Sequence, residues 1–189
     1  MKSFRHIMTS VLMSLSTVVF AQSDTHKSDI QKSDAQKQFD QLKTLAGVWQ
    51  GSVTMSPPSA KIDGTKIEVT LRVTSRGNAL VHEGQEAGTP LDSAKYDHPV
   101  TILYMDGDRL YLTHYCDAGN RPRMVARLSA DGKSVEFDFV DLSGGNQYGH
   151  MHQALFTIID ANHHAEDWTY MEPGDKPAHA HMDLQRATK

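Results

Sequence analysis

The feature that most constrains the fold is the alternation of apolar and polar residues in short runs separated by turn residues. Residues 67–73 are apolar at every second position, and the run ends at Arg76-Gly77-Asn78. A period of two is typical of a half-buried β-strand. Similar runs flank Asp106-Gly107 and Asp131-Gly132, and Asp-Gly tolerates the positive φ angles of hairpin turns. The pattern predicts one strand starting at Trp49 and others at 66–74, 79–85, 100–105, 109–116, 124–129, 134–140, 150–159, 165–171 and 177–186.

The order of these hairpins predicts an all-β fold. Strands that follow one another through tight turns, without long crossovers, are typical of an up-and-down antiparallel closed β-barrel, here of roughly eight to ten strands. Closure also removes exposed strand edges. An open sandwich is the alternative. One short N-terminal helix is expected at about residues 34–45, with Ser33 and Gln36 as a capping box and Gly47 after its end.

The first residues have the pattern of a secretory signal. Lys2 and Arg5 precede an apolar run at 7–20, and Val19-Phe20-Ala21 is typical of a cleavage site. The run is too short for a membrane-spanning helix. We therefore expect an exported protein, periplasmic or extracellular after cleavage near Ala21. The expected parts are a signal peptide (1–21), a disordered polar tether (22–32) and a single barrel domain (33–189).

Charge and cysteine content exclude some functions. The net charge of −4 becomes −6 without Lys2 and Arg5, and the remaining basic residues are scattered, so nucleic acid is not an expected partner.

Cys116 is the single cysteine, which excludes an internal disulfide. It is a buried small side chain, a metal ligand or a reactive thiol, and the sequence leaves these open.

The segment Gly47-Val48-Trp49, after a short helix and at the start of the first strand, resembles the opening of the lipocalin-like (calycin) superfamily. The longer segment 45–51 and the segment 114–124 resemble bacterial secreted proteins of unknown function, and nitrobindin-like haem barrels open in a similar way. The resemblance covers most of residues 39–186. It implies a ligand-binding barrel that is more often a binder than an enzyme. It also implies that Trp49 closes one barrel end, with Arg186 over its ring as a cation–π contact.

Alternation within the predicted strands identifies candidate ligand contacts. His114 and Cys116 share a face with two leucines, and His150 shares a face with His152. Apolar walls with a few polar groups are typical of a small-molecule pocket. Each of these histidines is alternatively a structural or solvated side chain at the rim, and His179 and His181 are expected to point outward. The candidate ligand-binding residues are His114, Cys116, Arg123, His150, His152, Trp168 and Tyr170.

Three functions follow from these candidates. The first is an exported binder of a small, largely apolar ligand, with Arg123 as a solvated loop residue or a partner for an anionic group. The second is a metal or haem site. His114, Cys116, His150 and His152 suit zinc or copper, and His114 or His152 suits haem. The third is an enzyme with His114 as base and Cys116 as nucleophile, but no Asp or Asn is placed to orient the imidazole. The sequence favours a binder over an enzyme.

Overall fold

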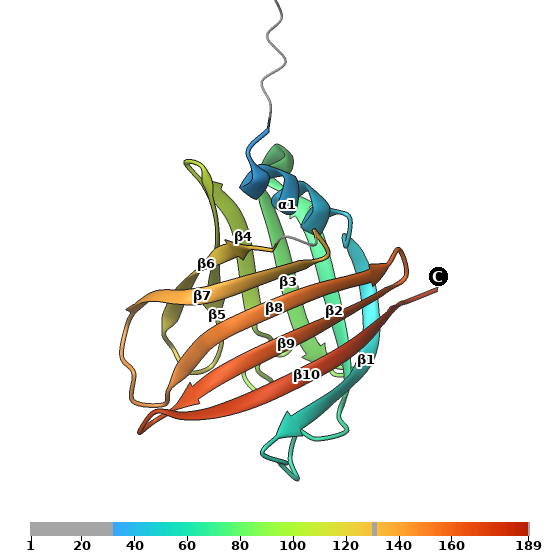
Figure 1. Cartoon of the computed structure of the whole chain (residues 1–189). Helices are drawn as coiled ribbons and strands as arrows, with labels where there is room; N and C mark the ends of the chain where they lie inside the picture. The colour runs from blue at the N-terminus through green and yellow to red at the C-terminus, as the bar shows by residue number, and fades with distance from the viewer. Residues whose placement is uncertain (1–31, 130–131, 189) are drawn as a thin grey trace, which may run out of the picture. The chain divides into compact units, whose positions relative to one another are not determined.

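The structure of the protein, a computed structural model, describes residues 32–129 and 132–188. The predicted signal peptide (1–21) and residues 22–31 of the predicted tether lie outside these residues. Figure 1 shows the elements found within them. They are α1 (Asp34–Lys43), β1 (Gly47–Ser56), β2 (Lys66–Thr74), the short 3₁₀ turn η1 (Ser75–Gly77), β3 (Ala79–Glu86), β4 (Val100–Asp106), β5 (Arg109–Tyr115), β6 (Arg121–Leu128), β7 (Ser134–Ser143), β8 (His150–Asp160), β9 (His163–Glu172) and β10 (Lys176–Arg186).

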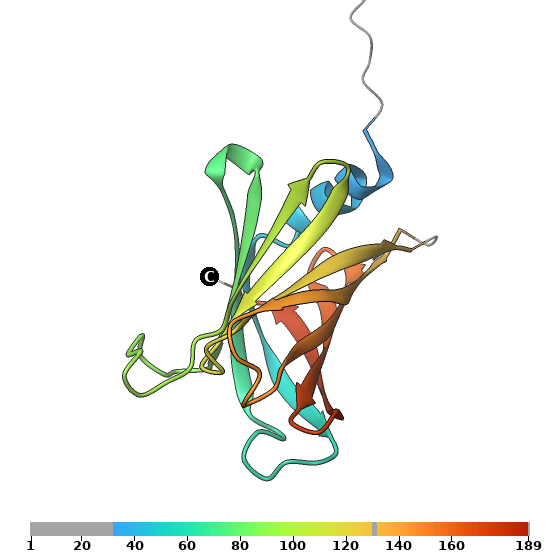
Figure 2. The same ribbon diagram turned by 90° about the vertical axis from the view of Figure 1, so that its left-hand side faces the viewer.

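The ten strands form a closed antiparallel barrel. Each strand pairs with its neighbours in the chain, and β1 pairs with β10 as well as β2, so that Trp49 lies opposite Arg186. Figures 1 and 2 show the strands curving around a common interior. The predicted fold class is therefore confirmed, and the sandwich alternative is excluded. No helix in the described part of the chain is long and apolar enough to span a membrane.

The helix α1 lies at one end of the barrel (Figures 1 and 2). Ser33 caps its start, since its hydroxyl oxygen accepts a hydrogen bond from the Gln36 N–H at 3.1 Å. The helix ends at Lys43, slightly before the predicted end, because the next backbone N–H groups bond three residues back and tighten the last turn. Phe39 and Leu42 face the barrel and belong to its buried apolar cluster. This end of the lumen is therefore closed.

Trp49, Arg186 and Gly47 join the helix to the seam between β1 and β10. Trp49 is fully buried, and its Nε1–H donates a hydrogen bond of 2.7 Å to the carbonyl oxygen of Leu45. The guanidinium carbon of Arg186 lies 4.1 Å from the centre of the Trp49 ring, and its Nη1 donates to the carbonyl oxygen of Ala46. Gly47 has a φ of 147°, and a Cβ there would lie 2.5 Å from Nη1 of Arg186. The glycine thus leaves room for the arginine, and the contact implied by the resemblance is present.

Candidate functional site

A cavity of about 260 Å³ occupies the half of the lumen away from α1. The lining residues Ile67 and Glu86 lie at the start of β2 and at the end of β3. The helix α1 lies at the opposite end of β2, because it ends shortly before Gly47, which pairs with Leu71. The floor of the cavity is made by three ring side chains, each at least nine-tenths buried: His82, His114 and Trp168. Its walls are apolar, and they are made by Ile67, Val69, Met151, Ala180 and Met182. Its mouth is lined by Gly84, Gln85, Glu86, Asp97 and Pro99.

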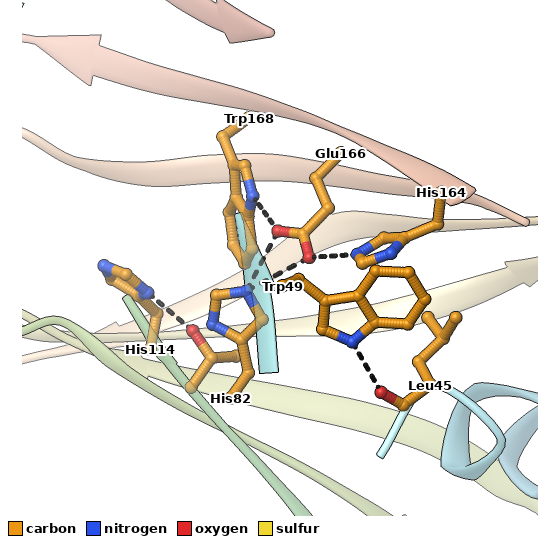
Figure 3. A network of polar contacts seen from close by, with 8 residues as sticks. Leu45, Trp49, His82, His114, His164, Glu166 and Trp168 are labelled. Atoms are coloured by element: carbon orange, nitrogen blue, oxygen red, sulfur yellow. Dashed lines mark hydrogen bonds and ion pairs between the residues drawn. The ribbon is translucent and has the colours of Figure 1, made fainter. Parts of the chain in front are cut away.

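Beneath this floor, the carboxylate of Glu166 is fully buried and accepts hydrogen bonds from three side chains (Figure 3). Nε2 of His82 lies 2.9 Å from Oε2, and Nε2 of His164 lies 3.0 Å from Oε1. The indole Nε1–H of Trp168 donates to Oε2 at 2.9 Å. His82 comes from β3 and the other three residues come from β9. The network therefore connects opposite walls of the barrel.

The charges of this network stabilise one another. Burial alone would lower the pKa of His82, but the charge of Glu166 and the hydrogen bond to it outweigh burial and raise that pKa. Burial alone would raise the pKa of Glu166, but the charge of His82 and hydrogen bonds from His82 and His164 hold it well below its usual range. At neutral pH the Glu166 carboxylate beneath the floor thus lies beside an imidazole that favours its charged form.

His114 is a second imidazole at the floor, on β5, with a different charge state. Its Nδ1 lies 2.8 Å from the hydroxyl oxygen of Thr101 on β4, and its ring lies 5.7 Å from that of Trp168. Burial, together with the positive charge of His82, lowers the pKa of His114 to about 4. The ring is therefore neutral at physiological pH. Two histidines with opposite shifts in pKa meet at one cavity.

Of the seven predicted ligand contacts, the structure brings His114 and Trp168 to this cavity. His150 and His152 do not line it. The alternation that placed them inward is broken by a bulge, because the register of β8 against β9 shifts between Met151 and Gln153. As a result Met151 lines the cavity, while the two imidazoles contact each other at 3.2 Å and pack on Phe139.

The other three predicted contacts lie elsewhere. Cys116 lines a separate surface pocket with Asp97 and Asp117, and burial and these two carboxylates raise its pKa. Arg123 is paired with Asp141 at 2.6 Å on the outer surface. The hydroxyl of Tyr170 donates to a backbone carbonyl oxygen at 2.7 Å. His114 and Cys116 line different cavities. The structure therefore does not support the hypothesis that His114 acts as a base on a Cys116 nucleophile.

A metal or haem site was the alternative from sequence. Within residues 32–129 and 132–188, no group of three or more His, Cys, Asp or Glu side chains is arranged to hold a metal ion. For haem, His114 offers a neutral imidazole, whereas His152 lies stacked on Phe139, 5.0 Å between ring centres. The cavity of about 260 Å³ is below the ~300–1,000 Å³ usual for drug-sized ligands, so it does not fit a haem macrocycle.

The sequence did not identify His82, His164 or Glu166 as residues of the site. A signal for Glu166 was present. An inward carboxylate in an apolar strand needs a buried partner, so Glu166 required one somewhere in the lumen. The partner, His82, alternates with Leu80 and Gly84 on β3. Its pairing across the lumen depends on barrel closure, which local periodicity does not encode.

Comparisons with known proteins support the fold alone. No family model and no curated protein matches this chain. Among solved structures, the chain is similar to Rv2717c from M. tuberculosis, with a TM-score of 0.57 and 15% sequence identity over 80% of this chain and 98% of that one. It is also similar to a protein of unknown function from the DUF3598 family of Nostoc punctiforme, with a TM-score of 0.40 and 9% identity over 77% of this chain and 48% of that one. The first likeness supports the barrel fold, and the second is too distant to support an argument.

Proposed function

We propose that this protein binds a small, largely apolar molecule in the lumen cavity. The observation that carries the proposal is the composition of that cavity: apolar walls from three strands, and a floor in which His82 and His114 supply the polar atoms. Ligand pockets combine bulk apolar contact with a few fixed polar groups in this way. One end of the lumen is closed by Trp49 and α1, so the ligand enters from the other end.

The volume of the cavity limits the ligand. About 260 Å³ suits a compact molecule of one or two rings rather than a long-chain lipid. Met151 and Met182 lie in its walls, and methionine side chains adapt to ligands of different shape. Trp168 adds a rigid aromatic contact surface beside them.

The proposal takes the chain to be an exported calycin-like barrel. The apolar run at 7–20 and the small residue Ala21 support export. N-terminal sequencing of the protein recovered from outside the cytoplasm tests this part, and a mature chain starting at Gln22 is expected.

The ligand is sought by mass spectrometry of whatever co-purifies with the natively exported protein. The matched variants are Ala180→Phe, which fills the cavity beside Trp168, and His179→Phe, which adds the same ring on the outer face of the same strand. A compound present in the wild type and in His179→Phe, but absent from Ala180→Phe, is expected. Equal amounts in both variants would place the compound outside the lumen and contradict the proposal.

Intrinsic fluorescence gives a second readout. The chain has two tryptophans, and Trp168 lines the cavity whereas Trp49 lies at the closed end. Ligand binding is expected to change the emission of Trp49→Phe protein, which retains Trp168. Trp168→Phe protein should show little change.

A further inference from the structure

One polar atom at the floor of the cavity has no partner. The ring of His82 is 5% exposed and uses Nε2 to bind Glu166, while its Nδ1 is buried without a hydrogen-bond partner among the described residues. Figure 3 shows that this second nitrogen faces away from Glu166, toward the side on which His114 lies. Both imidazoles line the cavity. An unsatisfied buried donor is costly, and a ligand that supplies an acceptor removes that cost.

We propose that the polar end of the ligand is an uncharged hydrogen-bond acceptor, such as a ketone, aldehyde or ester carbonyl, which accepts a hydrogen bond from Nδ1 of His82. This inference rests on the proposed function and specifies its ligand class. Nε2 of His82 carries a proton because it faces a carboxylate, which only accepts hydrogen bonds. Glu166 also favours the doubly protonated ring, so Nδ1 is a donor.

The charges around the cavity favour an uncharged acceptor over a carboxylate. Glu86 and Asp97 line the mouth, and Glu166 lies beneath the floor. No Lys or Arg is among the described residues that line the cavity. An anionic ligand would therefore add a negative charge to a site where the charge of His82 is already paired with Glu166. A neutral carbonyl uses the donor without that repulsion.

The test compares three naphthalenes of similar size on the wild-type protein. They are 2-acetylnaphthalene, which has a ketone, 2-ethylnaphthalene, which has no acceptor, and 2-naphthoate, which has a carboxylate. Isothermal titration calorimetry at neutral pH gives each Kd. The ketone is expected to bind about tenfold more tightly than the other two, the usual effect of satisfying one buried donor.

A spectroscopic readout on the wild-type protein identifies the hydrogen bond. The carbonyl ¹³C resonance of bound, labelled 2-acetylnaphthalene is expected to lie well downfield of its value in an apolar solvent such as cyclohexane, as it does when a carbonyl oxygen accepts a hydrogen bond. In protein labelled with ¹⁵N-histidine, the Nδ1 signal of His82 should shift with the ketone and not with the ethyl compound. His82→Gln assigns that signal and should remove the preference for the ketone, whereas His181→Gln, on the outer surface, should retain it.

The outcomes separate the inference from the proposed function. Equal affinity for the ketone and the ethyl compound, or tightest binding of 2-naphthoate, would overturn the inference while the lumen binder stands. Failure of all three compounds to bind would overturn the proposed function, and with it the inference. A bound ¹³C resonance at its value in an apolar solvent, upfield of its value in water, would show that His82 is not the donor.

Discussion

Nε2 of His82 lies 2.9 Å from Oε2 of Glu166, although β3 and β9 are not neighbours in the sheet. The contact therefore crosses the lumen and divides it. On one side lies the apolar core that includes Phe39 of α1, and on the other lies the cavity. The charged pair of His82 and Glu166 therefore connects two walls of the barrel, and its His82 ring forms part of the floor of the candidate site.

Glu166→Gln is expected to lower the free energy of unfolding by about 3 kcal/mol or more. The amide keeps the shape of the carboxylate but brings an N–H₂ group against the N–H donors of His82, His164 and Trp168. Removing one member of a buried charged network leaves the others without compensation. Urea unfolding followed by tryptophan fluorescence measures the change.

The matched control is Asp167→Asn, one residue along β9. Asp167 pairs with His181 at 2.7 Å, but both side chains are about half exposed. An exposed pair contributes about 1 kcal/mol or less. Equal losses for the Asp167 and Glu166 variants would refute a special role for the buried network.

The stability of the fold is expected to fall as the pH drops below 6.5, in part because of His114. Its pKa is lowered to about 4 in the folded protein, so protonation favours the unfolded chain, and this loss proceeds between pH 6.5 and pH 4. At pH 5 the effect is about 2 kcal/mol. The pKa shift of His82 is in the opposite direction, so its contribution is fully present below pH 6.5 and is lost as the pH rises.

The variant His114→Asn isolates this effect, since its amide can take the place of Nδ1 beside Thr101 but does not titrate. Its free energy of unfolding should fall less steeply between pH 7 and pH 5 than that of the wild type. Identical slopes for the two proteins would mean that His114 is already protonated, or solvated, in the folded state.

The fold could be read from the sequence because its signals are local. Alternation defines a strand such as β2, and turn residues such as Asp106-Gly107 define where hairpins reverse, so the strand order follows from the chain order. Closure was also expected, but the register that sets Trp49 opposite Arg186 depends on contacts between the two ends of the chain. No turn joins β1 to β10, so the turn geometry that fixes the register of a hairpin does not set the register of this pair.

The site was predicted only in part, for two physical reasons. The bulge at His152 reverses the inward and outward positions of β8, so alternation pointed to His150 instead of Met151. The partnership of His82 with Glu166 joins residues far apart in sequence and in the sheet. By contrast, His114 and Trp168 lie on strands without a bulge at those positions, and alternation placed both correctly.

Arg186→Lys is expected to lower the free energy of unfolding by about 2 kcal/mol. The guanidinium lies over Trp49 and donates to three carbonyl oxygens, those of Thr44, Ala46 and Ala161. A lysine ammonium cannot reach this set while stacking on the ring. Arg127→Lys is the control, because Arg127 is exposed and pairs with surface carboxylates. A similar loss for both variants would contradict the closing role of Arg186.

Cys116 is expected to react slowly with thiol reagents at pH 7. Burial, with the negative charges of Asp97 and Asp117, raises its pKa and so lowers the fraction of reactive thiolate. Labelling of the native protein by a disulfide reagent should be at least about tenfold slower than labelling in urea. Asp117→Asn should speed the native reaction. A native rate equal to that in urea would instead indicate an exposed, activated thiol.

Gly51→Ala is expected to weaken the seam that closes the barrel. A Cβ at Gly51 would clash with the backbone carbonyl oxygen of Asp183 on β10, so the two strands would have to separate. Overpacking of this kind costs about 1–3 kcal/mol. The control is Gly145→Ala, because a Cβ at Gly145 meets nothing within 4 Å and the φ of this residue is not positive. Urea unfolding should separate the two variants, and a loss at Gly51 no larger than at Gly145 would show that the β1–β10 seam yields without strain. The close approach of β10 also explains why residue 51, two positions after Trp49 in the opening segment, is a glycine: β10 leaves no space there for a side chain.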